Sequence, residues 1–209
     1  VHVYLGRKIR CKSVDQVIAM IEQLHTLGYE QIFLADDNCS AERKHAWNIL
    51  QAIQDWNRGQ KVPVEFTTQL SIETAKDDPF LALAAQAGLR SAYIGIESPN
   101  RESLEECNKT MNLQNDVLQS IKKFHAHGIQ VIASTIVGFD HDGPDIFQEQ
   151  LNFFLKAGTP QVWVYALQAH DGTRLKKRMI EEQRYIDYPE SFYQAEDKQV
   201  ADKWNIKHL

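Results

Sequence analysis

Apolar and polar positions along this chain form one pattern that repeats five times. An amphipathic stretch ends at a glycine, and a few residues later comes a run rich in β-branched and aromatic residues. The runs lie at residues 31–35, 64–69, 92–96, 131–137 and 162–167, after Gly28, Gly59, Gly88, Gly128 and Gly158, with Gly59 the most distant from its run. Glycine suits the position after a helix because it adopts left-handed backbone angles without a Cβ clash. The pattern predicts five strands, each preceded by a helix, in a parallel sheet covered by helices.

The amphipathic stretches carry apolar residues at helical spacing and residues that cap helices. Ser13 and Gln16 match a capping box at the start of the first helix. The second is expected over residues 41–56, and the third starts from Asp78 as N-cap with Pro79 in the first position. The fifth has an apolar stripe that we expect to face inward, formed by Phe147, Leu151, Phe154 and Leu155. A short basic helix follows around residues 174–182, so we expect one α/β domain over residues 1–182 and a polar tail or extension over residues 183–209.

Composition narrows the class of protein. Of 209 residues 43% are hydrophobic, which is too high for a disordered chain, and no apolar run is long enough to span a bilayer. The formal net charge of -5 argues against a nucleic-acid surface, which is usually basic. Cys11, Cys39 and Cys107 lie too far apart for a disulfide framework or a metal knuckle. With no secretory signal visible, we expect a cytoplasmic protein, and the first residue, Val1, suggests a piece of a longer polypeptide.

Polar and acidic residues follow every predicted strand. Ligands of parallel α/β folds bind at the carboxyl ends of the strands, so these residues are the candidates for chemistry. They are Asp36, Asp37 and Asn38; Thr68 and Gln69; Glu97 and Ser98; Asp140, His141 and Asp142; and Gln168, His170 and Asp171. Carboxylates there suit a divalent metal, a cationic amine or the hydroxyls of a ribose. Alternatively, Asp36 or Asp37 caps the helix at residue 41, and Asp142 caps the helix at residues 144–147.

Several of these strand-end segments resemble the radical S-adenosylmethionine (SAM) enzymes, especially their cobalamin-binding branch. The similar segments are IFLADDN at residues 32–38, FTTQLS at 66–71, YIGIES at 93–98 with NRESL at 100–104, TIVGFD at 135–140 with PDIF at 144–147, and AHDGT at 169–173. The resemblance implies a TIM-barrel-like, partial (β/α) barrel, of which this chain would supply five of the six core parallel strands. It also implies SAM and a 4Fe-4S cluster, held by a Cys-x-x-x-Cys-x-x-Cys loop, which together generate a 5′-deoxyadenosyl radical.

The chain departs from the family at that loop, because no such cysteine motif occurs in it. The first strand, the cluster loop and any cobalamin domain are therefore expected upstream of Val1, and this chain alone lacks the cluster ligands. No catalytic residue and no metal ligand is assigned to it.

Candidate cofactor-binding residues follow from the resemblance by position. Asp36, Asp37 and Asn38 match the loop that receives the amino group of SAM, and Thr68 and Gln69 match polar rim positions near SAM or substrate. Glu97 and Ser98 match the position that holds the ribose. The segment from Ser134 to Gly138 matches the strand along the adenine, and Leu167 ends the last strand, also near the adenine.

The function expected is that of a fragment of a radical SAM enzyme, with a cobalamin-dependent methyltransferase as the leading candidate. Two alternatives remain open: a divalent-metal (β/α)-barrel lyase or hydrolase, and a non-catalytic binding module derived from a barrel. The expected partners are a small-molecule cofactor and substrate, without nucleic acid or membrane. An open barrel edge would also present unpaired backbone groups and invite self-association.

Overall fold

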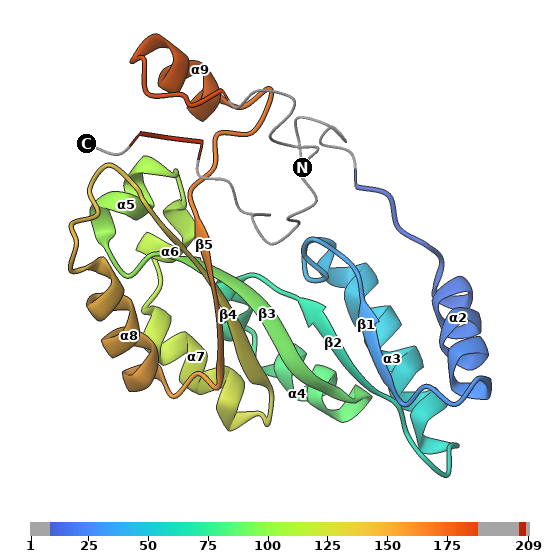
Figure 1. The fold of residues 1–209 in the computed structure, drawn as a ribbon. Helices are drawn as coiled ribbons and strands as arrows, with labels where there is room; N and C mark the ends of the chain where they lie inside the picture. Colours follow the sequence, from blue (N-terminus) through green and yellow to red (C-terminus); the bar gives the residue numbers. More distant parts are fainter. Residues whose placement is uncertain (1–8, 188–204, 208–209) are drawn as a thin grey trace.

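Five parallel strands form a single curved sheet in the order in which they occur along the chain. A computed structural model describes residues 9–187 and 205–207. The strands are β1 (Gln31–Leu34), β2 (Glu65–Gln69), β3 (Leu89–Glu97), β4 (Gln130–Val137) and β5 (Gln161–Ala166), and every neighbouring pair is parallel. The sheet curves into a half-barrel, with the carboxyl ends of its strands at one edge (Figure 1). The prediction of a partial (β/α) barrel with five parallel strands is confirmed.

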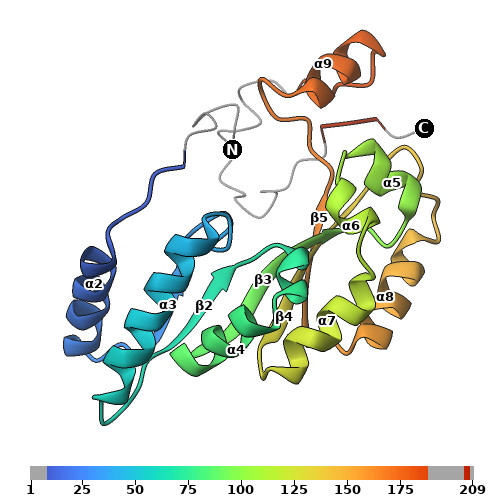
Figure 2. The ribbon, with the colours of Figure 1, turned by 180° about the vertical axis from the view of Figure 1, so that it is seen from behind.

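Helices cover only the convex face of this half-barrel (Figures 1 and 2). The longer ones are α2 (Val14–Thr26), α3 (Arg43–Arg58), α4 (Asp78–Ala87), α7 (Val117–Ala126) and α8 (Ile146–Ala157), as the apolar stripes predicted. Three short elements at the carboxyl edge were not predicted: the 3₁₀ helix η1 (Ile72–Lys76), α5 (Arg101–Glu106) and α6 (Thr110–Leu113). The basic helix α9 (Arg174–Glu181) follows β5.

The alternation of side chains along β3 separates the two faces of the sheet. Ala92, Ile94 and Ile96 are fully buried under the helices, whereas Tyr93 and Gly95 between them are only half-buried. Since successive side chains of a strand point to opposite faces, Tyr93, Gly95 and their registered neighbours line the open concave face. That face is where a ligand can reach the sheet.

The junction before β3 shows why a glycine is needed there. Gly88 has φ +111, and a Cβ at this position would lie 2.6 Å from the carbonyl oxygen of Val64. Asn57 fills the same junction: its Nδ2 donates to the carbonyl oxygens of Val64 and Ala87, and its Oδ1 accepts from the Val64 amide. Gly59 differs from the prediction, because its φ of -86 continues the right-handed turn of α3.

The helix starts agree with the sequence in part. The Ser13–Gln16 capping box is confirmed at the start of α2. The N-cap of α4 is Asp77, one residue before the predicted Asp78, and it accepts from the Phe80 amide. The helix-cap alternative for the rim acids is wrong for the following helices: Glu42 precedes α3 and Asp145 precedes α8, both without a capping side-chain bond. Asp36 instead accepts from the Asn38 amide in its own loop, and Asp142 accepts from the Gly138 and Phe139 amides and from Ser103 Oγ.

The prediction that all four apolar residues of the α8 stripe face inward is wrong. Only Phe154 is buried, at 5% exposure, whereas Phe147, Leu151 and Leu155 are 61%, 52% and 71% exposed. The neighbouring strand β5 is at the edge of the sheet, and its Trp163 and Val164 are also exposed. An amphipathic stripe indicates that a helix packs on something, and among the described residues nothing covers this side of α8.

Beyond β5 the described residues form a small second cluster. Ala169, Met179 and Ile206 are buried together, with Leu175 and Tyr185 packed against them. Tyr185 pairs with Ile206 in an antiparallel bridge, so described residues on both sides of the predicted boundary at residue 182 pack together. None of the described helices has the length and apolarity to cross a bilayer.

Candidate functional site

The loop after β1 presents two carboxylates at the carboxyl edge. Asp36 and Asp37 are exposed, and the Oδ1 of Asp36 accepts from the Asn38 amide at 3.0 Å. Asn38 Oδ1 accepts from the Ser40 amide and hydroxyl, at 3.2 and 2.7 Å. The Cys39 amide then donates to the Gln69 carbonyl oxygen at 2.9 Å, which ties the loop to the end of β2. These bonds fix the loop, and both acids face solvent.

The cysteines do not form an iron–sulfur site among themselves. Burial raises the pKa of the Cys39 thiol to about 11, which disfavours the thiolate form that a cluster ligand needs. Burial also raises the pKa of Cys107, and Cys11 is exposed. Within residues 9–187 and 205–207 no three His, Cys, Asp or Glu side chains gather as a metal site would require. The residues present therefore do not fit a 4Fe-4S cluster.

Thr68 and Gln69, at the end of β2, face opposite sides of the sheet. Thr68 is only 2% exposed, and its hydroxyl donates to the Leu34 carbonyl oxygen at 3.0 Å. Gln69 is half-buried and registered with Tyr93, which places it on the concave face. Of the two, Gln69 is placed to reach a ligand, while Thr68 joins β1 to β2.

Glu97 and Ser98 likewise differ in what they can contact. Glu97 has φ +68, and its Oε1 accepts from Lys109 Nζ at 2.6 Å. Ser98 is 2% exposed, and its Oγ accepts from the Asn100 amide at the start of α5. Glu97 therefore offers an oriented carboxylate, while Ser98 shapes the turn that follows it. Sequence reasoning missed Lys109, which lies twelve residues from the carboxylate it pairs with.

The loop after β4 is organised by Asp142. Its Oδ2 accepts from the amides of Gly138 and Phe139, at 2.8 and 3.0 Å, and its Oδ1 accepts from Ser103 Oγ at 2.7 Å. Ser134, on the strand itself, is registered with Gly95 on the concave face. Asp142 thus holds the loop that begins at Gly138 and connects it to α5.

Two contacts besides the β4–β5 ladder join the region of β5 to the other strands. The Leu167 amide donates to the Val137 carbonyl oxygen at 2.9 Å, which extends the β4–β5 ladder by one residue. The hydroxyls of Tyr93 and Tyr165 lie 3.1 Å apart across the concave face. The side chain of Leu167 packs on the small cluster around Met179, at the edge of the rim.

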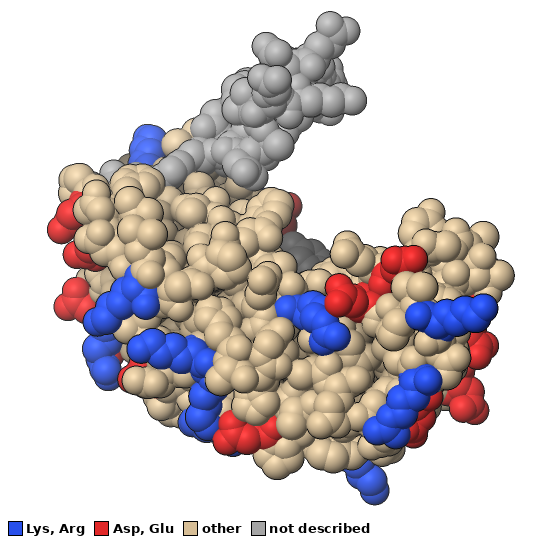
Figure 3. Space-filling model, turned by 90° about the horizontal axis from the view of Figure 1, so that it is seen from below, with Lys and Arg blue, Asp and Glu red and all other residues tan. Residues whose placement is uncertain are grey.

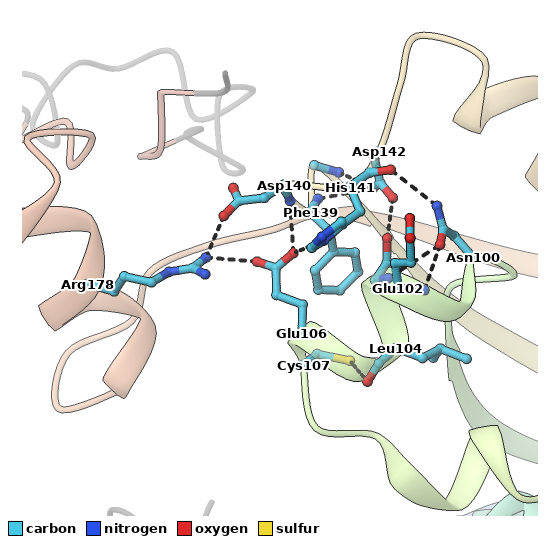
Figure 4. Close-up of polar contacts among 12 residues, drawn as sticks. Asn100, Glu102, Leu104, Glu106, Cys107, Phe139, Asp140, His141, Asp142 and Arg178 are labelled. Carbon is cyan, nitrogen blue, oxygen red and sulfur yellow. Dashed lines mark hydrogen bonds and ion pairs between the residues drawn. The ribbon is translucent and has the colours of Figure 1, made fainter.

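A network of ion pairs attaches α9 to this rim (Figure 4). Glu106 accepts from the Asp140 amide at 2.9 Å and pairs with Arg178 at 2.8 Å. Arg178 also pairs with Asp140, to which Arg184 donates a further hydrogen bond. The Arg184 hydrogen bond, followed by the charges of Arg178 and Arg184, lowers the pKa of Asp140. Asp140 therefore serves the attachment of α9, and its carboxylate is already occupied by two arginines.

Two hollows among the described residues lie away from most of the predicted site residues. The larger, of about 590 Å³, is at the amino ends of the strands, between Phe33, Thr67 and Gln130, with the Arg90–Glu65 ion pair beside it. Figure 3 shows this lower face, which is hollowed and carries mixed charge. The smaller, of about 270 Å³, lies beside α5, α6 and α7 and includes Ser98. The rim itself is an open edge, as expected of a half-barrel.

The family assignment follows from a match over most of this architecture. The family model described as the radical SAM superfamily matches residues 3–154, which include β1 to β4 and their rim loops. The chain belongs to the radical SAM superfamily. The membership confirms the resemblance seen in the strand-end segments. It does not support the alternative hypothesis of a divalent-metal (β/α)-barrel lyase or hydrolase.

Two curated relatives of this chain are named as a methyltransferase and a methylase. An uncharacterized methyltransferase of Synechocystis sp. is 28% identical over 186 residues, which cover 88% of this chain and 35% of that protein. The hopanoid C-2 methylase of Rhodopseudomonas palustris is 25% identical over 182 residues, covering 87% of this chain and 34% of that protein. This radical SAM chain thus spans about a third of the length of the curated relatives it matches.

Solved structures share the fold. The radical SAM methyltransferase TsrM from Kitasatospora setae, with cobalamin and a 4Fe-4S cluster bound, aligns with a TM-score of 0.66 at 16% identity, over 85% of this chain and 34% of that one. The cobalamin-dependent radical enzyme OxsB aligns with a TM-score of 0.58 at 19% identity, over 72% of this chain and 23% of that one. At these identities the likeness supports the half-barrel fold.

Proposed function

We propose that this chain is the SAM-binding half-barrel of a cobalamin-dependent radical SAM methyltransferase. Family membership supports the SAM chemistry, and the two methyl-transferring relatives support the reaction class. The cobalamin and cluster bound to TsrM support the same cofactors here. The observation that carries the proposal is the set of rim loops: Asp36, Asp37, Gln69 and Glu97 reach one carboxyl edge from three successive strands.

Each of these groups has chemistry that suits a part of SAM. The exposed carboxylates of Asp36 and Asp37 can hold the cationic amino group, with Asn38 shaping their loop. Glu97 can accept hydrogen bonds from the ribose hydroxyls, with Ser98 shaping its turn. A 4Fe-4S cluster held outside this sequence would supply the electron that cleaves SAM into methionine and a 5′-deoxyadenosyl radical.

Three of the remaining predicted residues lie near the adenine in this proposal. Ser134 and Gly138 lie along β4 and its loop, and Leu167 closes the end of β5. Gln69 offers an amide on the concave face near SAM or substrate. Thr68 keeps a structural part, because its hydroxyl is buried against β1.

The iron–sulfur cluster requires ligands from elsewhere. The sequence has three cysteines, Cys11, Cys39 and Cys107, and they do not gather at one place among the described residues. We infer that three thiolates come from polypeptide other than this sequence. Because such thiolates need a reducing compartment, we also propose a cytoplasmic location.

Isothermal titration calorimetry tests the SAM site. The chain is expected to bind SAM, and Asp37→Asn and Glu97→Gln are each expected to weaken binding about tenfold, as the loss of a charge-assisted hydrogen bond predicts. Asp55→Asn, on the exposed surface of α3, is the matched control and should bind as the unaltered chain does. No heat of binding with SAM, from a folded chain, would refute the proposal.

Two further parts of the proposal concern organisation. We propose that residues 1–182 form the radical SAM part and residues 183–209 an extension of it.

We also propose that β5 and the exposed face of α8 form a contact between two copies of the chain, because an edge strand beside exposed Phe147 and Leu151 invites pairing. Sedimentation velocity of the chain and of Leu151→Lys tests the contact, and monomers of both at every concentration would refute it.

A further inference from the structure

The end of β3 is distorted in a way that redirects Glu97. The β3–β4 register shifts between Gly95 and Glu97, so that Gly95 lies opposite Ser134 while Glu97 lies opposite Thr135. Glu97 also has φ +68, in the left-handed region that residues with a Cβ seldom adopt. Bulges of this kind often occur beside active sites, where they change the direction of a side chain. The backbone here is therefore set to aim one carboxylate.

Two buried side chains hold this distorted segment. Asn112 Nδ2 donates to the carbonyl oxygens of Gly95 and Ile96, at 3.1 and 2.7 Å. Thr135 Oγ1 donates to the Glu97 carbonyl oxygen at 2.7 Å. The backbone groups that the bulge removes from the regular ladder are thus paired by side chains, which fixes the direction of Glu97.

The carboxylate that results lies back over Gly95 on the concave face. A Cβ at Gly95 would be 2.5 Å from Glu97 Oε1 and 3.3 Å from Lys109 Nζ, so both charged groups occupy space that only glycine leaves open. Lys109 Nζ donates to Oε1 at 2.6 Å, and the two side chains are 33% and 17% exposed. Among the residues that the structure describes, the other oxygen, Oε2, accepts no hydrogen bond.

We propose that Lys109 is a positioning residue that holds the Glu97 carboxylate for ribose recognition. Lys109 occupies Oε1 and keeps the carboxylate against Gly95, and Oε2 then accepts from the hydroxyls of the nucleoside. Without Lys109 the Glu97 side chain can adopt more rotamers, so binding of the nucleoside loses side-chain entropy and becomes weaker. The inference rests on the proposed function, since it concerns the nucleoside of SAM.

The test compares two nucleosides on the folded chain. Adenosine and 2′,3′-dideoxyadenosine differ only in the hydroxyls that Glu97 would accept from. Calorimetry with both probes is carried out on the unaltered chain, Lys109→Met, Glu97→Gln and the double variant. Lys123→Met, which breaks the exposed pair with Asp78, is the control. We expect Lys109→Met and Glu97→Gln to weaken adenosine binding about tenfold each and the double variant no more than Glu97→Gln alone.

The dideoxy probe separates positioning from a general structural role. Binding of 2′,3′-dideoxyadenosine is expected to be the same for all folded variants. Equal losses for both nucleosides, or adenosine binding unchanged by Lys109→Met, would overturn the proposal. So would losses that add fully in the double variant.

Two more variants keep the test decisive. Gly95→Ala is expected to displace the carboxylate and to lower adenosine affinity as Lys109→Met does. Lys109→Arg, which keeps the charge, should restore part of the affinity, and it replaces Lys109→Met if that variant does not fold. If the unaltered chain binds SAM but the variants do not differ, this inference fails alone; if it binds neither SAM nor nucleoside, the proposed function fails with it.

Discussion

The junction built around Asn57 offers the sharpest test of how this half-barrel is held together. Asn57 is 6% exposed and makes three hydrogen bonds, of 2.8 to 3.0 Å, that connect the end of α3 to the start of β2 and the end of α4. Asn57→Ala removes all three and leaves one amide and two carbonyl oxygens buried without that partner. At about 1 kcal/mol per hydrogen bond the variant should lose about 3 kcal/mol of unfolding free energy.

Asn152→Ala is the matched control for this measurement. Asn152 is also in a helix, but it is exposed, and among the described residues its side chain accepts one hydrogen bond, from Gln148 Nε2 at 2.9 Å. Helix propensity changes by a similar amount in both variants, so their difference reports the buried hydrogen bonds. Urea unfolding followed by far-ultraviolet circular dichroism gives both free energies, and we expect the control to change by less than about 0.5 kcal/mol. Equal losses for the two variants would refute the reasoning.

Three more predictions concern glycine, the β4 loop and pH. Gly88→Ala should lower the free energy of unfolding by about 2 kcal/mol or more, because the positive φ combines with a Cβ that would lie 2.6 Å from a backbone oxygen. Gly128→Ala should lower it less, because there is open space around Gly128, and equal melting temperatures of the two variants would contradict this. Asp142→Ala should speed hydrogen exchange at the two amides that donate to it, and unchanged exchange there would rule out its role in holding the loop. Arg184→Met should destabilise the chain by about 2 kcal/mol at pH 7. Because the folded pKa of Asp140 is lowered, its ion-paired stability is present above the unfolded pKa of about 4 and is lost as the pH falls below it. The Arg184→Met deficit measured by urea unfolding should therefore shrink at pH 3, and the same deficit at pH 7 and pH 3 would contradict the assignment.

The sequence carried the elements because their signals are local. The strands appear where the apolar runs predicted them, and the positive φ of Gly28, Gly88, Gly128 and Gly158 agrees with the helix-end reading of those glycines. Residues a few positions apart set these features, so a single chain read in order is enough to find them. The family resemblance has the same origin, because its segments are the strand ends themselves.

Errors arose where a residue's partner is distant in the sequence. The stripe of α8 is amphipathic, but whether Leu155 is buried depends on what packs beside β5. Likewise Asp142 looked like a helix cap, yet it bonds to Ser103, thirty-nine residues away. Neither choice has a local signature, since capping and loop-closing aspartates have the same composition and spacing.

The sequence by itself thus determined the half-barrel, the polar rim and the radical SAM resemblance, because periodicity and strand-end residues specify them. Only the tertiary structure decided which rim groups face a ligand. It placed Thr68 on the buried face under the helices, fixed Ser98 in a turn, and paired Glu97 with Lys109 over Gly95. Those outcomes depend on strand register and on which face each side chain takes, and a register shift such as the one in β3 is set by contacts between strands.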